Sequence, residues 1–226
     1  MIPKASFVIP VYNGEEFLSP AIKSCLGQSV KNVEVIVIND GSTDTTQKVI
    51  DFWTGKDERV KNIKFDVNKG RSIARNAGIE AAKSDFIFAM DADDLCLANR
   101  VSETIGCFKK NPTADIVYGG FHLIDVFGNP LGHVPVKPFS WNDLIKTKFT
   151  YIGHSTMAFK KSLGVYYTDG EYSKNAIDDW KFQVDAAKKG AKFVCVDKIL
   201  SVYRVIQKQR DEKRILELKE ATLAEA

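Results

Sequence analysis

The first half of this 226-residue chain is predicted to be an α/β domain, with a mostly parallel sheet covered by helices on both faces. Short apolar runs rich in β-branched residues alternate four times with segments whose apolar residues recur at helical spacing. Glycine, asparagine and aspartate follow these runs and mark turns. Because strands joined by helical crossovers pair in parallel, the alternation predicts a parallel sheet.

The expected strands and helices of the first half follow one another without a break. Buried strands are predicted at residues 5–11, 33–38, 63–67 and 85–90. Helices are predicted at 15–26 and 100–110. Another is predicted to be capped by Ser42 or Thr43 and to end near residue 53, and a further one begins after the turn at 68–70. Ligands of such sheets bind beyond the carboxyl ends of the strands. The polar turns at 12–13, 39–40 and 91–94 lie at those ends and predict a site there.

The second half has a less regular pattern. It predicts a strand at 116–126 with a bend or bulge at Gly119-Gly120, and a hairpin at 127–134 around Gly128-Asn129. A short capped helix at 140–148, a strand at 156–159 and a helix at 179–189 closed by Gly190 follow. Strands are predicted at 193–196 and 200–205, and residues 208–226 are charged and helix-prone, with no evident packing partner.

Composition excludes several classes of protein. The net charge of +3 is low for a nucleic-acid binder of this length, so no nucleic-acid partner is expected. The four cysteines form no CxxC pair, which predicts reduced thiols and a cytoplasmic protein. The sequence shows no signal peptide and no apolar run long enough to span a membrane, so any association with a membrane is expected to be peripheral.

The acidic turn Asp91-Ala92-Asp93-Asp94 comes directly after an apolar strand. Three carboxylates on one turn repel each other, so gathering them is unfavourable unless a cation neutralises them. Carboxylate oxygens suit a hard divalent ion, Mn²⁺ or Mg²⁺, which keeps open positions for phosphate oxygens. Taken alone the turn also fits a solvated acidic loop, and its place at the carboxyl end of a strand favours the metal site.

Two further carboxylate positions leave alternatives open. Asp40 fits either a hydrogen bond to the ring N–H of a uracil-like base or a turn residue that caps the next helix. In Asp178-Asp179-Trp180, a carboxylate at a helix start fits either a cap or a general base that takes the proton of an acceptor hydroxyl.

Four stretches occur in a fixed order along the chain. They are VIPVYNGEEFLSPAIKSCLGQS from Val8, VEVIVINDGSTD from Val33, NKGRSIARNAGIEAAKSDFIFAMDADD from Asn68 and IDDWKF from Ile177. Together they resemble the inverting glycosyltransferases of family 2, densely over about the first hundred residues and more sparsely to Arg204. The resemblance implies the GT-A fold, a Rossmann-like sheet with a smaller mixed sheet on the acceptor side.

The resemblance implies roles for residues on the nucleotide side. Pro10 and Tyr12 are expected to line the base pocket, with Tyr12 stacking on the uracil-like ring. Asp40 is expected to hydrogen-bond that ring, and Arg71 to contact the base or the ribose.

The segment Asp91-Ala92-Asp93 matches the DxD motif of the family. The resemblance implies that Asp93 binds the metal, while Asp91 meets the ribose or a metal-bound water and shares the metal site. Asp94 is expected to support the turn instead.

The remaining matches concern the base and its surroundings. Asp179 matches the catalytic base of the family, and Asp178 is expected to affect the cap or the acceptor fit. Arg75 and Asn76 match a family pattern and are expected to be structural links under the site.

One position departs from the family pattern. Many relatives end the domain with Tyr-Arg-x-His, whereas here Ile206 follows Tyr203-Arg204-Val205, so a metal or phosphate contact from histidine is missing. His154 is a candidate for the acceptor or pyrophosphate side, with a purely structural role as the other interpretation.

The resemblance implies a metal-dependent enzyme that moves a sugar from a nucleotide diphosphate, UDP in the first instance, to a hydroxyl of a saccharide or lipid-linked acceptor. The resemblance also implies a role in polysaccharide or glycoconjugate synthesis. The enzyme is expected in the cytoplasm, and any contact with a membrane is expected at its inner face. Residues 1–206 form the expected domain, with a nucleotide-binding half at 1–112 and an acceptor-binding half at 113–206. Residues 207–226 are expected to form a charged helical tail.

Two other classes compete with this interpretation. A haloacid-dehalogenase-like phosphatase also uses paired aspartates, in a DxDxT or DxDxV motif after its first strand. In this chain the aspartates follow the fourth predicted strand, and Leu95 stands where that motif has Thr or Val. A non-catalytic sugar-nucleotide binding module is the second alternative, and the presence of Asp93 and Asp179 argues against it.

Overall fold

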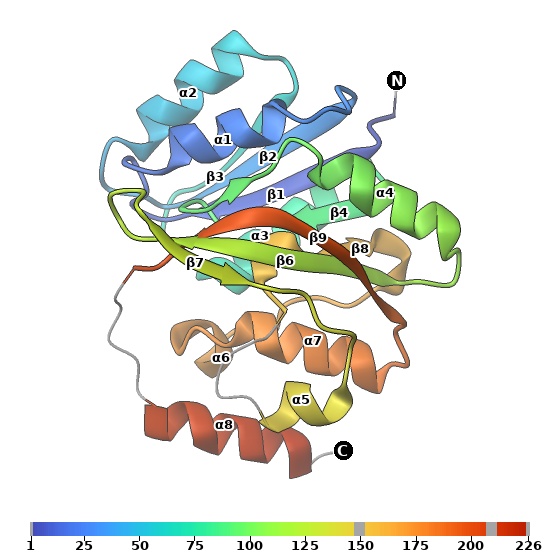
Figure 1. The fold of residues 1–226 in the computed structure, drawn as a ribbon. Helices are drawn as coiled ribbons and strands as arrows, with labels where there is room; N and C mark the ends of the chain where they lie inside the picture. The colour runs from blue at the N-terminus through green and yellow to red at the C-terminus, as the bar shows by residue number, and fades with distance from the viewer. Residues whose placement is uncertain (1, 147–151, 207–211, 225–226) are drawn as a thin grey trace.

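One nine-stranded sheet runs through the protein, in the order β3-β2-β1-β4-β8-β6-β9-β5, with β7 paired to β6 (Figure 1). The computed structural model describes residues 2–146, 152–206 and 212–224. The strands are β1 (Ala5–Val11), β2 (Val33–Asp40), β3 (Val60–Phe65), β4 (Phe86–Ala89), β5 (Leu95–Cys96), β6 (Ile116–Ile124), β7 (Pro130–Val134), β8 (Ala158–Lys160) and β9 (Phe193–Arg204).

The half of the sheet formed by β3, β2, β1 and β4 is parallel throughout. Its central strand β1 places Val8 between Ile36 of β2 and Ala89 of β4. Every residue of β1 and β2 is buried, as expected for strands that are covered by helices on both faces. The predicted α/β fold with four alternating units is therefore confirmed.

The other half of the sheet is mixed and continues directly from the parallel half. Strand β8 is antiparallel to both β4 and β6, while β6 and β9 pair in parallel. The predicted hairpin forms, since β7 pairs with β6 in antiparallel fashion. The predicted bulge is present too, because the register between β6 and β9 shifts on both sides of Gly120.

Helices cover both faces of the sheet (Figure 1). They are α1 (Leu18–Leu26), α2 (Thr46–Lys56), α3 (Arg71–Ala81), α4 (Arg100–Lys110), α5 (Trp141–Lys146), α6 (Glu171–Lys174), α7 (Asp178–Lys188) and α8 (Glu212–Ala224), with the 3₁₀ turns η1 (His154–Thr156) and η2 (Lys161–Leu163). One core lies between the sheet and α1, α2 and α4, and a second lies between the sheet, α3 and α7. Helix α3 approaches β1 and β2 closely at Gly78, where a Cβ would lie 2.5 Å from a methyl of Val8.

The boundaries of several predicted strands differ in the structure, since β3 is Val60–Phe65 and not 63–67, and β8 is Ala158–Lys160 and not 156–159. Residues 193–196 and 200–205 were expected to be separate strands, but Phe193–Arg204 is one strand of 12 residues. The exposed polar pair Asp197-Lys198 interrupts the apolar pattern there, and pairing with β6 carries the strand through it. The two-residue strand β5 was not predicted, because two residues carry no periodic pattern.

The C-terminal helix α8 has a packing partner that the sequence did not reveal. Ile215 and Leu218 of α8 join a third apolar cluster with Leu144 of α5 and Trp180 of α7. The hydroxyl of Tyr172 in α6 also lies 2.7 Å from that of Thr222. Helix α8 is therefore a packed part of the fold that supports the start of α7.

Candidate active site

The three polar turns predicted to form a site do meet at one edge of the sheet. Because β1 lies between β2 and β4 and runs parallel to both, the residues that follow these strands are neighbours. Tyr12 follows β1, Asp40 ends β2, and the acidic turn follows β4.

A cavity of about 460 Å³ opens at this edge, beside the start of α3. Its lining consists of Tyr12, Asp40, Asn68, Lys69, Gly70, Arg71, Asp169, Gly170, Ser173 and Lys174. Tyr12 is 50% exposed, which leaves its ring accessible to a planar ligand. Pro10 is buried in β1 and is not among the lining residues.

Asp40 has a clear structural task within this cavity. Its carboxylate accepts the backbone N–H groups of Lys69 at 2.7 Å and Gly70 at 3.0 Å, and the residue is only 2% exposed. These bonds hold the loop that leads into α3. Asp40 does not cap α2, since its carboxylate bonds the loop after β3 and the N-cap residue of α2 is Thr45.

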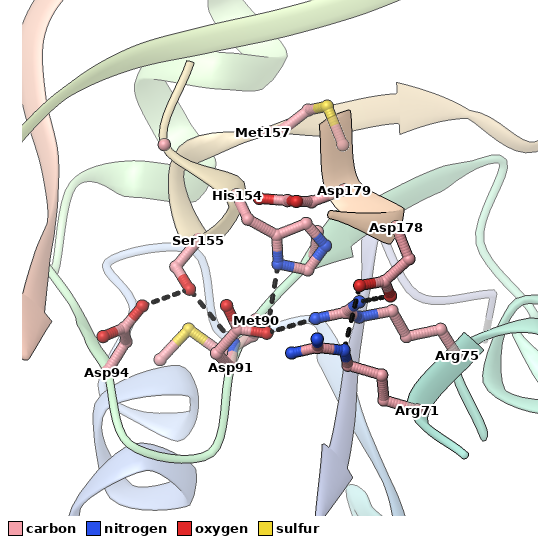
Figure 2. Close-up of polar contacts among 12 residues, drawn as sticks. Arg71, Arg75, Met90, Asp91, Asp94, His154, Ser155, Met157, Asp178 and Asp179 are labelled. Carbon is pink, nitrogen blue, oxygen red and sulfur yellow. Dashed lines mark hydrogen bonds and ion pairs between the residues drawn. The ribbon is translucent and has the colours of Figure 1, made fainter. Parts of the chain in front are cut away.

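Two arginines of α3 connect the cavity, the acidic turn and the start of α7 (Figure 2). Arg75 pairs with Asp178 and also with Asp91, at 2.7 Å from Nη2 to Oδ1. Arg71 Nε lies 2.9 Å from Asp178 Oδ1, and its Nη2 donates to the carbonyl of Ser173. Burial lowers the pKa of Arg75, but the charges of Asp178 and Asp91 outweigh it and raise the pKa above its ordinary value. The expectation that Arg75 is a structural link under the site matches these contacts.

The carboxylates of the acidic turn point to different partners instead of gathering around one centre. Asp94 Oδ2 accepts the hydroxyl of Ser155 at 2.6 Å, and its Oδ1 accepts the backbone N–H of Arg204 at 2.9 Å. Burial, with the charges of Asp93 and Asp91, raises the pKa of Asp94 well above its usual range. Burial also favours a higher pKa for Asp91, but the contacts of Asp91 with His154 and Arg75 outweigh burial and hold this pKa well below its ordinary value.

Protein groups offset part of the repulsion expected within the acidic turn. Arg75 neutralises Asp91, and burial favours the protonated form of Asp94. Within residues 2–146, 152–206 and 212–224, no three His, Cys, Asp or Glu side chains form a metal-binding group. Asp91 and Asp93 are the two half-buried carboxylates of the turn. That number fits the usual Mg²⁺ site of phosphate-transferring enzymes, where one or two carboxylates are completed by water and substrate phosphates.

His154 faces the underside of the acidic turn. It is 5% exposed, its Nδ1 lies 3.1 Å from Asp91 Oδ1, and its Nε2 lies 2.8 Å from the hydroxyl of Tyr167. Of the two interpretations left open for this histidine, its contacts are those of a support for Asp91 and not of a residue on the acceptor side.

Helix α7 separates its first two residues, as the rotation of about 100° per residue in a helix requires. Asp178 is 1% exposed and forms ion pairs with Arg71 and Arg75. The hydroxyl of Ser72 also donates to its Oδ2 at 3.3 Å. Asp179 is only half-buried, and its Oδ1 accepts the backbone N–H of Trp180 at 2.8 Å. The expectation that Asp178 serves the cap or the acceptor fit does not match this ion-paired position.

Several residues of the site carried no recognisable pattern in the sequence. Asp169, Ser173 and Lys174 form one wall of the cavity, although they lie about a hundred residues after the opposite wall. Arg204 donates from Nε to the carbonyl of Asp93 at 3.0 Å and fixes the acidic turn to the end of β9. Asp169, Ser173 and Lys174 lie outside the four stretches quoted above and carried no signal, whereas Arg204 belongs to the Tyr203-Arg204 match at the end of the domain.

The four cysteines are free, as the absence of a CxxC pattern predicted. Cys25 and Cys96 are buried side by side, with 3.8 Å between the sulfurs. No helix in the described part of the chain has the length and apolar character needed to cross a membrane.

The mixed sheet and its helices have the GT-A architecture that TarS also has. The model of the family described as "Glycosyl transferase family 2" matches residues 6–164. The chain belongs to this family.

Relatives identified by sequence carry glycosyltransferase names. An uncharacterized glycosyltransferase of Haemophilus influenzae is 36% identical over 130 residues, which cover 58% of this chain and 52% of that protein. The chondroitin synthase of Pasteurella multocida is 33% identical over 181 residues, or 78% of this chain and 18% of that protein. The chain thus spans about half, or less, of the length of these relatives.

Solved structures share the fold. TarS residues 1–349 of S. aureus, in complex with UDP, superpose with a TM-score of 0.73 at 18% identity, covering 99% of this chain and 66% of that one. The mannosyltransferase PcManGT of Pyrobaculum calidifontis, in complex with GDP-Man and Mn²⁺, gives a TM-score of 0.68 at 15% identity, covering 100% and 75%.

Proposed function

We propose that this chain is a metal-dependent inverting glycosyltransferase, which moves a sugar from a UDP-sugar to a hydroxyl of a saccharide acceptor. The observation that supports it most directly is the bridge made by Arg75, whose guanidinium contacts both Asp91 of the acidic turn and Asp178 of α7. This bridge ties the first turn of α7, where Asp179 follows Asp178, to the acidic turn.

The assignment of the donor rests on the cavity and on relatives. An exposed tyrosine ring beside buried polar groups suits a nucleobase, and the volume of about 460 Å³ suits a nucleoside. The TarS complexes with UDP and with UDP-GlcNAc favour uracil. The GDP-Man complex of PcManGT makes guanine the alternative to be tested alongside it.

The assignment of the acceptor rests on the relatives. The chondroitin and hyaluronan synthases of Pasteurella multocida each match 78% of this chain. Their names favour a saccharide acceptor and a place in polysaccharide synthesis. A lipid-linked acceptor is the alternative to a free saccharide, and it would require a peripheral contact with the membrane.

The proposed reaction is one in-line displacement. The acceptor oxygen forms a bond to the anomeric carbon while the bond from that carbon to the diphosphate breaks, which inverts the configuration. Asp179 takes the proton of the acceptor hydroxyl, because it is the half-buried carboxylate of the pair while Asp178 is paired with arginine. Asp93 and Asp91 would hold a Mn²⁺ or Mg²⁺ ion, which would supply neutralisation of the charge on the departing diphosphate.

The proposal is tested with a panel of nucleotide diphosphates and their sugars. Thermal shift with UDP, GDP, ADP and CDP, each with Mn²⁺ and with EDTA, is expected to select UDP with metal. Release of UDP from UDP-sugars is then measured with and without oligosaccharide acceptors. Release of inorganic phosphate would support the phosphatase alternative, and binding without any release would support a non-catalytic binding module.

A further inference from the structure

The 3₁₀ turn η1 provides partners for two carboxylates of the acidic turn. His154 Nδ1 lies 3.1 Å from Asp91 Oδ1, and the hydroxyl of Ser155 donates to Asp94 Oδ2 at 2.6 Å. The same Ser155 hydroxyl accepts the backbone N–H of Asp91 at 3.1 Å. Figure 2 shows the side chains of His154 and Ser155 pointing toward the acidic turn.

The far side of His154 is held as firmly as the near side. Its Nε2 lies 2.8 Å from the hydroxyl of Tyr167, which is 4% exposed. The ring of Tyr167 stacks on Phe182 with 4.5 Å between centroids. The backbone of Tyr167 exchanges two hydrogen bonds of 2.8 Å with the side-chain amide of Asn76.

His154 has a polar group on each side of its ring. Nδ1 faces Oδ1 of Asp91 across 3.1 Å, and Nε2 shares a hydrogen bond of 2.8 Å with the hydroxyl of Tyr167, whose donor depends on the tautomer of the ring. A chain of contacts therefore runs from Tyr167 through His154 to Asp91.

We infer that Tyr167 and His154 are positioning residues for the metal and diphosphate end of the donor site. His154 and Arg75 both contact Oδ1 of Asp91, which holds the carboxylate in one orientation and leaves Oδ2 for the ligand. Neither Tyr167 nor His154 touches the donor, because both are almost fully buried beneath the turn. The inference rests on the proposed metal-dependent function, and it assigns the task of orienting the DxD motif to residues in the second half of the chain.

The test compares the metal dependence of nucleotide binding among variants. UDP affinity is measured by calorimetry in Mn²⁺ and in EDTA, and the ratio of the two affinities is the readout. Tyr167→Phe removes only the hydroxyl of the buried ring, and Tyr166→Phe removes the hydroxyl of the exposed neighbour as a matched control. Mutation of a residue that hydrogen-bonds a metal ligand commonly lowers metal affinity by about 10- to 100-fold. We expect the ratio to fall about tenfold for Tyr167→Phe and to stay unchanged for Tyr166→Phe.

Two variants of the histidine sharpen the test. Asn carries an N–H donor close to the position of Nδ1, so His154→Asn should keep the contact with Asp91. Its affinity ratio should therefore fall less than that of His154→Leu, which loses the contacts with both Asp91 and Tyr167. An unchanged ratio in Tyr167→Phe and His154→Leu would overturn the inference. So would an equal loss of affinity in Mn²⁺ and EDTA, which is the result of a merely structural role. A wild-type protein whose UDP affinity ignores Mn²⁺ would instead overturn the proposed metal dependence itself.

Discussion

The two halves of the chain contribute to one site in different ways. Residues 1–112 place Tyr12, Asp40 and the acidic turn at the ends of adjacent parallel strands, where an α/β sheet generally binds its ligands. The second half contains the proposed base Asp179 and, in larger number, the groups that orient the first half, such as Ser155 and Arg204. The comparison teaches that chemical groups and the residues that hold them can come from separate halves of a fold.

The largest effect is expected from the first half. Asp93→Ala removes the proposed metal ligand and should reduce transfer by more than about 1,000-fold, in the range for losing several kcal/mol of charge stabilisation. Because Asp93 is half-buried and lies on a turn, the melting temperature should stay close to that of the wild type. Transfer rate and thermal melting are measured together. A variant that melts far below the wild type would show that Asp93 is structural.

The second half is expected to supply chemistry as well as support. Asp179→Asn should lower turnover by roughly 100-fold or more, in the range for losing a general base. UDP affinity should be kept, because the proposed base acts on the acceptor. Transfer rate with acceptor and calorimetry with UDP check both statements. Full turnover in this variant would remove Asp179 from the mechanism.

Asp178→Asn should separate support from chemistry within the same helix. The change leaves Arg71 and Arg75 without their shared carboxylate, and Asp178 is 1% exposed. Breaking a buried ion pair from one side is expected to lower the free energy of unfolding by about 3 kcal/mol. Urea denaturation measures this loss beside Asp179→Asn. Equal stability of the two variants would contradict the distinction between them.

Helix α8 allows the supporting role of the second half to be tested away from the site. Leu218→Ala removes a buried side chain from the cluster around Trp180 and should lower the free energy of unfolding by about 2 kcal/mol. Leu216→Ala, the same exchange at a position that is 57% exposed, should change it by less than about 0.5 kcal/mol. Urea denaturation of both variants gives the comparison, and similar effects would mean that α8 does not pack as described.

The smallest effect is expected at Asp94, where the halves meet through Ser155 and Arg204. A carboxyl whose pKa is raised by folding binds its proton more tightly in the folded state, so its contribution to stability falls as pH rises above the ordinary aspartate value of about 3.9. Asp94→Asn has no such proton. The stability of the variant relative to wild type should therefore increase from pH 5 to pH 8, measured by urea denaturation. A difference that is the same at both pH values would contradict the raised pKa.

The alternating strands and helices of the first half could be predicted from the sequence because their patterns are local. The stretches from Val33 and Asn68 also carried enough of a family pattern to point to Asp40, Asp91 and Asp93. The partner of each carboxylate could not be predicted in the same way. Ser155 follows Asp94 by 61 residues and Arg204 follows it by 110, and no periodicity relates such positions.

Asp178 and Asp179 show the same division at a single step of the chain. The sequence determined that a carboxylate pair starts a helix, and that a helix turns its neighbours in different directions. Only the tertiary structure decided which of the two is buried against Arg71 and Arg75 and which remains half-exposed. The physical reason is that hydrophobic period and turn chemistry are properties of neighbouring residues, whereas burial and ion pairing depend on which segments the completed sheet brings into contact.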